Sequence, residues 1–149
     1  MTRELIFSNS FEPQLAAFTM WKSLVNVEGA LTQTLAPSDL PGFEIIPAEA
    51  KYTQFDSFGH PLTGVQSFTI RVHFAHPQLA VSTLRSARSA DVSLLEAFFA
   101  GGYIVPAPVI GDVARIDSVR LVKIDPALLS KTATRSSITA HAEYTFTIY

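Results

Sequence analysis

The stretch "SFTIRVHFAHP", residues Ser67 to Pro77, decides the fold class because its side chains alternate between apolar and polar. A period of two is typical of a β-strand with one buried and one solvated face. The apolar positions are Phe68, Ile70, Val72 and Phe74, and the polar positions are Ser67, Thr69, Arg71 and His73. Proline cannot donate a hydrogen bond to a sheet, so we expect the strand to end at Pro77.

The two histidines of this stretch raise the question of a metal site. His73 and His76 are an odd number of positions apart, so within one strand they point to opposite sides. Zinc needs at least one further protein ligand, which the local sequence does not offer. We therefore interpret His73 as a solvated strand residue and His76 as a strand-end residue. The sequence predicts no metal and no other cofactor.

Three further segments have the composition of strands. The last thirteen residues, "SITAHAEYTFTIY" (137–149), alternate most cleanly, with Ile138 to Ile148 on the apolar side. The segment "FEIIPAEAKYTQF" (43–55) reads as a strand in which Pro47 marks an edge, a bulge or the strand start. The turn-forming segment "DSFGHPLTG" after it predicts a long β-hairpin. For "ARIDSVRLVKID" (114–125), the core candidates are Val119, Leu121, Val122 and Ile124.

Two segments are predicted to be helices. The first covers residues 12–37, with Pro13 in its first turn and Pro37 as its stop. Its expected apolar stripe is Ala17, Met20, Trp21, Leu24, Val27, Leu31 and Leu35. The second is most regular between Ala90 and Ala100 and ends at Gly101-Gly102, although the capping-box spacing of Ser93 and Glu96 allows a later start. Its apolar positions are Val92, Leu95, Phe98 and Phe99.

The expected element order is therefore helix, strand, strand, helix, strand, strand. This order predicts one α+β domain over residues 1–149, with an antiparallel sheet of about four main strands and two helices on one face. The opposite face is expected to be polar and carries these residues: Ser67, Thr69, Arg71, His73, Thr139, His141, Glu143 and Thr145.

The composition indicates a protein that assembles. Charged residues make up 16% of the 149 residues and the net charge is −2, whereas about 25% is the average charged fraction. A surface covered by other subunits explains so few charges, and a monomer whose surface is rich in serine and threonine is the alternative. The chain has no cysteine, which excludes disulfides and thiol nucleophiles. A near-neutral balance also argues against a dedicated nucleic-acid binder.

The N-terminal "MTRELIFSNSFEP" lacks the basic start and the apolar run of a signal peptide. No stretch approaches the roughly 18 apolar residues of a membrane helix. We therefore expect a soluble chain, cytoplasmic at synthesis, with no membrane partner.

No sequence motif predicts catalysis. The seven glycines form no phosphate-binding loop, and no nucleophile elbow is present. Asp56, Ser57 and His60 lie together in the predicted hairpin turn, where turn formation explains them better than a catalytic triad does. We expect no catalytic residue and no enzyme. The alternative is a small-molecule-binding or enzymatic domain that uses Arg71, His73, His141 and Glu143 of the polar sheet face.

The predicted hairpin tip is the candidate interface. Phe55 and Phe58 lie among turn residues beside His60. Aromatic side chains are disfavoured in water unless something covers them, and they are common anchors of protein interfaces. Either these side chains contact a neighbouring molecule, or the tip folds back and buries both rings against its own domain.

In outline the chain resembles the tail-terminator proteins of long-tailed phages and the related tail-completion and neck proteins. The matching segments are the helix "LAAFTMWKSLVNVEGALTQTL", the hairpin around "SFTIRVHF", the short helix "SLLEAFF" and the strands "RLVKID" and "EYTFTIY". The resemblance implies a structural virion subunit that forms a ring, typically a hexamer, at the head-proximal end of the tail tube. The implied partners are tail-tube and neck proteins, with DNA only passing through the ring. The implied location is the virion neck, after assembly in the host cytoplasm. Another capsid- or baseplate-associated subunit remains an alternative.

Overall fold

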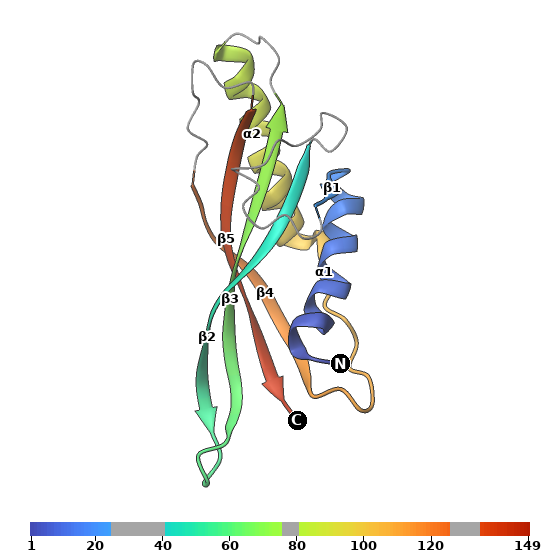
Figure 1. Cartoon of the computed structure of the whole chain (residues 1–149), viewed down its shortest axis with the longest axis vertical. Coiled ribbons are helices and arrows are strands. Elements are labelled where there is room, and N and C mark those ends of the chain that lie inside the picture. The colour runs from blue at the N-terminus through green and yellow to red at the C-terminus, as the bar shows by residue number, and fades with distance from the viewer. Residues whose placement is uncertain (25–40, 76–80, 126–134) are drawn as a thin grey trace.

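The structure of the protein is a computed structural model (Figure 1), and the residues described are 1–24, 41–75, 81–125 and 135–149. The elements, in chain order, are α1 Arg3–Thr19, β1 Lys22–Ser23, β2 Gly42–Phe55, β3 Pro61–Ala75, α2 Val81–Ala97, the π-helical turn η2 Phe98–Gly102, β4 Ala114–Asp125 and β5 Arg135–Ile148. Over these described ranges, neither helix combines the length and the apolar character that crossing a membrane requires.

The strands form one curled, five-stranded mixed sheet in the order β1-β2-β3-β5-β4. β1 pairs parallel with β2, whereas the other neighbours are antiparallel. The sheet twists so strongly that its strands cross in the view of Figure 1. The predicted fold, an antiparallel four-stranded sheet in the order helix, strand, strand, helix, strand, strand, is therefore wrong. The reason is β1: two residues, Lys22 and Ser23, are too short to show an alternating pattern.

The first helix lies earlier in the chain than expected. α1 begins at Arg3 and ends at Thr19, so the predicted range of 12–37 is wrong. The Thr2 hydroxyl accepts a hydrogen bond from the Leu5 backbone and caps the helix. Met20 ends it in the left-handed conformation, with φ 62°, and its backbone N–H donates to the Ala16 carbonyl. Most of the predicted helix C-terminal to Met20 falls in residues 25–40, outside the described residues.

The buried face of α1 explains why the helix tolerates an internal proline. Pro13, predicted at the helix start, lies inside α1 and removes one helical hydrogen bond, a change that costs about 3 kcal/mol or more. Phe7, Phe11 and Leu15, spaced four residues apart, are buried. Each such side chain contributes about 1.5–3 kcal/mol on burial. The free energy gained by burying the three side chains together exceeds the cost of the helical hydrogen bond that is lost at Pro13.

The predicted hairpin is confirmed. β2 and β3 pair antiparallel, and the register slips between Pro47 and Ala50, so Pro47 lies at a bulge, one of the three positions predicted for it. In β3, Phe68, Ile70 and Val72 are buried, as the alternation predicts. In β5 the same holds for the even-numbered positions Ile138, Ala140, Ala142, Tyr144 and Phe146.

β4 has the predicted bounds but only part of the predicted core. Val119, Leu121 and Ile124 pack against the core, whereas Val122 is exposed. A register shift between Leu121 and Lys123 explains this difference, because the extra residue at a bulge leaves the alternation.

The second helix begins earlier than the alternative start at Ser93. α2 begins at Val81, and η2 continues it to Gly102, so the expected glycine end is confirmed. Leu95 and Phe98 are buried, as predicted.

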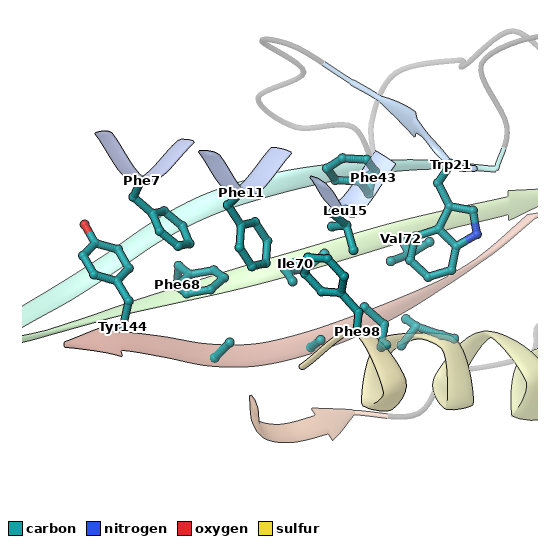
Figure 2. Packing of buried hydrophobic residues seen from close by; sticks show 14 of the residues in the cluster. Phe7, Phe11, Leu15, Trp21, Phe43, Phe68, Ile70, Val72, Phe98 and Tyr144 are labelled. Carbon is teal, nitrogen blue, oxygen red and sulfur yellow. The ribbon is translucent and has the colours of Figure 1, made fainter. Parts of the chain in front are cut away.

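Aromatic rings join α1 to the sheet. The Phe7 ring lies with its centroid 4.8 Å from Phe68 and 4.2 Å from Tyr144, and Phe11 lies 5.3 Å from Phe98. Figure 2 shows these rings in the layer between α1, the sheet and η2. These aromatic rings therefore form the part of the core that lies between α1 and the sheet.

Candidate assembly interface

The end of the β2–β3 hairpin, residues 51–63, is called here the hairpin arm. It extends past the helices and away from the rest of the molecule (Figure 1). Residues 51–55 are all exposed, and the one ring contact of this part of β2 within the described chain is that of Tyr52 with Phe146, at 6.1 Å between centroids. The hydroxyls of Thr53 and Thr63 lie 2.8 Å apart and join the two strands of the arm.

Asp56 organises the tip of the arm. Its Oδ1 accepts hydrogen bonds from the backbone N–H groups of Phe58 (2.8 Å) and His60 (2.9 Å). Its Oδ2 lies 2.9 Å from Nδ1 of His60. The hydrogen bond from the His60 backbone is the main reason why the pKa of Asp56 lies below its ordinary value. Asp56 and His60 thus shape the turn, as predicted for turn residues.

The two aromatic side chains of the tip are presented to solvent. Phe58 is 84% exposed and Phe55 is 56% exposed. The ring of Phe58 lies 6.1 Å from the imidazole of His60, which is itself exposed. The alternative in which the tip folds back and buries both rings is therefore wrong for the described chain. The turn instead holds Phe58 beside His60 at the far end of the arm, and Phe55 is the last residue of β2 before this turn.

The polar sheet face does not form a single site. Arg71 and His73 contact Glu44 of β2, with the Arg71 Nη1 to Glu44 Oε1 distance at 3.5 Å. Elsewhere on this face, His141 Nε2 lies 2.7 Å from Asp125 Oδ2, and Glu143 pairs with Arg120. The four residues of the alternative binding site therefore have three separate partners. These contacts are cross-strand ion pairs, the common use of charges on a sheet.

His73 is buried, so its prediction as a solvated residue is wrong. Its Nε2 lies 3.3 Å from Glu44 Oε1, and both side chains are only 7% exposed. Glu44 stands opposite Arg71 in the β2–β3 register, and Gly42 stands opposite His73, so one carboxylate reaches both side chains. Glu44 was not among the predicted site residues, because its role depends on the pairing of two strands. His76 lies outside the described residues.

Nothing in the described ranges gathers three histidine, aspartate or glutamate side chains at one point that could hold a metal ion.

A second exposed apolar segment is "YIVPAPVIGD" (103–112), whose prolines predict a loop or an edge segment. Between η2 and β4, the side chains of Ile104, Val109, Ile110 and Val113 are exposed. The side-chain amide of Gln14 in α1 pairs with both backbone groups of Ile104, at 2.8 and 2.9 Å, and holds the start of this loop. An apolar segment with two prolines and no periodicity was the available signal for this surface.

The comparisons with known proteins add no relative. No family model matches the sequence, and no curated protein matches it.

Proposed function

We propose that this protein is a structural virion subunit of a long-tailed phage, a tail-terminator or neck protein that forms a ring between the tail tube and the head connector. The observation that carries the proposal is the hairpin arm. It presents two aromatic rings, Phe55 and Phe58, at the end of a projection with no covering layer. An ordered aromatic pair in water is typical of an interface anchor.

The polar sheet face supports an assembly role over an enzymatic one. Arg71, His141 and Glu143 each pair with a different carboxylate or guanidinium group. Charges paired in this way offer no convergent set of groups for acid-base chemistry. The proposed partners are copies of the same chain in a ring, together with tail-tube and neck proteins.

 We expect a hexameric ring, through which DNA passes without being held by a dedicated binding surface. The proposed location is the neck of the virion, after assembly in the host cytoplasm.

The test removes both rings from the tip. We expect wild-type protein to form a ring by size-exclusion chromatography with light scattering and by negative-stain imaging. The double variant Phe55→Ser/Phe58→Ser is expected to keep its circular dichroism spectrum and its melting temperature while losing the ring, since neither ring contributes to the core.

Met20→Asn is the matched control, because Met20 is 83% exposed and lies outside the arm, and asparagine tolerates its left-handed backbone. This control should assemble like the wild type. An assembly unchanged by the double variant would contradict an interface at the tip, and a wild-type chain that stays monomeric at all concentrations would contradict the ring.

A further inference from the structure

A groove with a volume of about 220 Å³ lies between the N-terminal half of α1 and the β2 side of the sheet. Its apolar floor consists of the rings of Phe7, Phe68 and Tyr144, which Figure 2 shows next to one another. The rest of its lining comes from Thr2, Glu4, Leu5, Ser8, Glu12, Ile45, Pro47 and Gln66. An apolar cavity of about 150 Å³ holds one benzene molecule. The groove therefore has room for a single ring with a short substituent.

Most polar groups of the lining already have partners in the protein. The Gln66 side chain accepts a hydrogen bond from Arg3 Nη2 at 3.0 Å and donates to the Ala48 carbonyl at 2.8 Å. The Thr2 hydroxyl caps α1, and the Ser8 hydroxyl donates to a backbone carbonyl of the same helix. The walls are thus held in place by the chain itself. A ligand then binds without the entropic cost of ordering them.

The hydroxyl of Tyr144 is the exception. Tyr144 is only 2% exposed, and its hydroxyl has no hydrogen-bond partner within the described residues. Figure 2 shows this hydroxyl directed toward the start of α1. Burial raises the pKa of Tyr144, while the neighbouring Arg3 guanidinium acts to lower it. Because a guanidinium only donates hydrogen bonds, Arg3 cannot accept the phenol proton. A buried donor without an acceptor is unfavourable, so a molecule that brings an acceptor into the groove gains a hydrogen bond.

The charges around the groove favour a neutral acceptor over an anionic one. Glu4 and Glu12 line it, and within the described ranges neither carboxylate forms an ion pair. Arg3 borders the groove, but it is bound to Gln66 and lies 3.8 Å from the centroid of the Phe146 ring. Two carboxylates beside one engaged guanidinium repel a second anion.

We propose that the α1–β2 groove binds a small, neutral molecule of one ring, whose oxygen accepts a hydrogen bond from the Tyr144 hydroxyl. An aromatic ketone has this chemistry. Its ring packs against Phe7 and Phe68, and its carbonyl oxygen accepts the phenol proton. This ligand site is separate from the hairpin arm and does not depend on ring formation.

The first experiment compares three probes of similar size on the wild-type protein. Acetophenone carries the neutral acceptor, ethylbenzene lacks it, and benzoate is an anion. Binding is followed in NMR spectra by the amide resonances of Leu5 and Ser8, with that of Val122 on β4 as the reference. We expect acetophenone to bind about five- to tenfold more tightly than ethylbenzene, since one hydrogen bond is added. Benzoate should also bind more weakly than acetophenone.

The second experiment removes the donor. Tyr144→Phe keeps the ring, and because the lost hydroxyl has no partner, this variant should melt at or above the wild-type temperature. It should bind acetophenone about five- to tenfold more weakly than the wild type does, and its affinity for ethylbenzene should be unchanged. Tyr149→Phe is the matched control, because it removes the hydroxyl of an exposed tyrosine outside the groove. This control should bind acetophenone like the wild type.

Three results would overturn this ligand site. If no probe shifts the Leu5 and Ser8 resonances at millimolar concentration, the groove holds only water. Equal affinities for acetophenone and ethylbenzene, or an unchanged affinity of Tyr144→Phe for acetophenone, would mean that Tyr144 is not the donor. Tighter binding of benzoate would mean that the carboxylates do not select a neutral molecule. Light scattering on the same samples reports assembly separately, so the ring-forming function stands or falls by a different measurement.

Discussion

The two halves of the β2–β3 hairpin are continuous in sequence but differ in what covers them. At its root, Phe43, Phe68 and Ile70 are buried under α1 and η2. In the arm, Tyr52, Phe55 and Leu62 are exposed on the same two strands. Both halves have the composition of strands, and that composition does not indicate whether another layer covers the strand. The root stabilises the fold, whereas the arm is left available for a partner.

A charge at the centre of the root tests the first half of this comparison. Ile70 is fully buried. The substitution Ile70→Asp places an unpaired carboxylate there, which is expected to cost several kcal/mol in the free energy of unfolding and to prevent folding. Thr69→Asp places the same charge one residue along, on the opposite face, and should cost far less. The measurement is urea unfolding followed by circular dichroism. Equal losses for both variants would mean that the two faces of β3 are not distinguished by burial.

Glycine substitutions compare the boundary of the root with the tip. A Cβ atom at Gly64 would lie 2.6 Å from Phe146 Cζ and 2.7 Å from the Lys51 carbonyl oxygen. We expect Gly64→Ala to cost about 1–3 kcal/mol in the free energy of unfolding, because the clash includes a backbone atom.

Gly59→Ala meets no atom within 4 Å, and its only strain is the positive φ of 83°. We expect this strain to loosen the tip locally and to leave the melting temperature nearly unchanged, since exposed turns open independently of the core. A melting temperature lowered equally by both variants would show that tip and root unfold as one unit.

Acid should affect the tip before it affects the root. The pKa of Asp56 is lower in the folded protein than its ordinary value of 3.8, so ionised Asp56 stabilises the turn above that value. This stabilisation is lost as the pH falls through the lowered pKa. The amide resonances of Phe58 and His60 should shift over that acidic range in NMR spectra, and those of Ile70 should not. Asp56→Asn should remove the titration.

The features that were predicted correctly depend on local pattern. The hairpin, the bounds of β4 and the alternation of β5 follow from side chains within each segment. The tip residues Phe55 and Phe58 were selected because turn-forming residues surround them. The structure adds that the turn is held by Asp56 and that nothing in the described chain covers the rings.

The features that were missed depend on contacts between distant segments. Met20 and Trp21 fit a helical stripe in sequence, but in the structure Met20 ends α1 and β1 follows at once. β1 exists only because Lys22 and Ser23 meet the start of β2. His73 is buried because Glu44 faces it from the neighbouring strand. The residue pattern within a single segment does not predict such contacts between segments.

The irregular register of β2 has a consequence for how far the protein can aggregate. Within the described residues, the outer edge of β2 is paired only at Gly42 and Phe43. Further along, its register on β3 slips at three places, and Pro47 lacks a backbone donor. An edge of this kind is a poor template for another strand. We therefore expect another molecule to add to this edge of β2 through side-chain contacts rather than by pairing as a further strand.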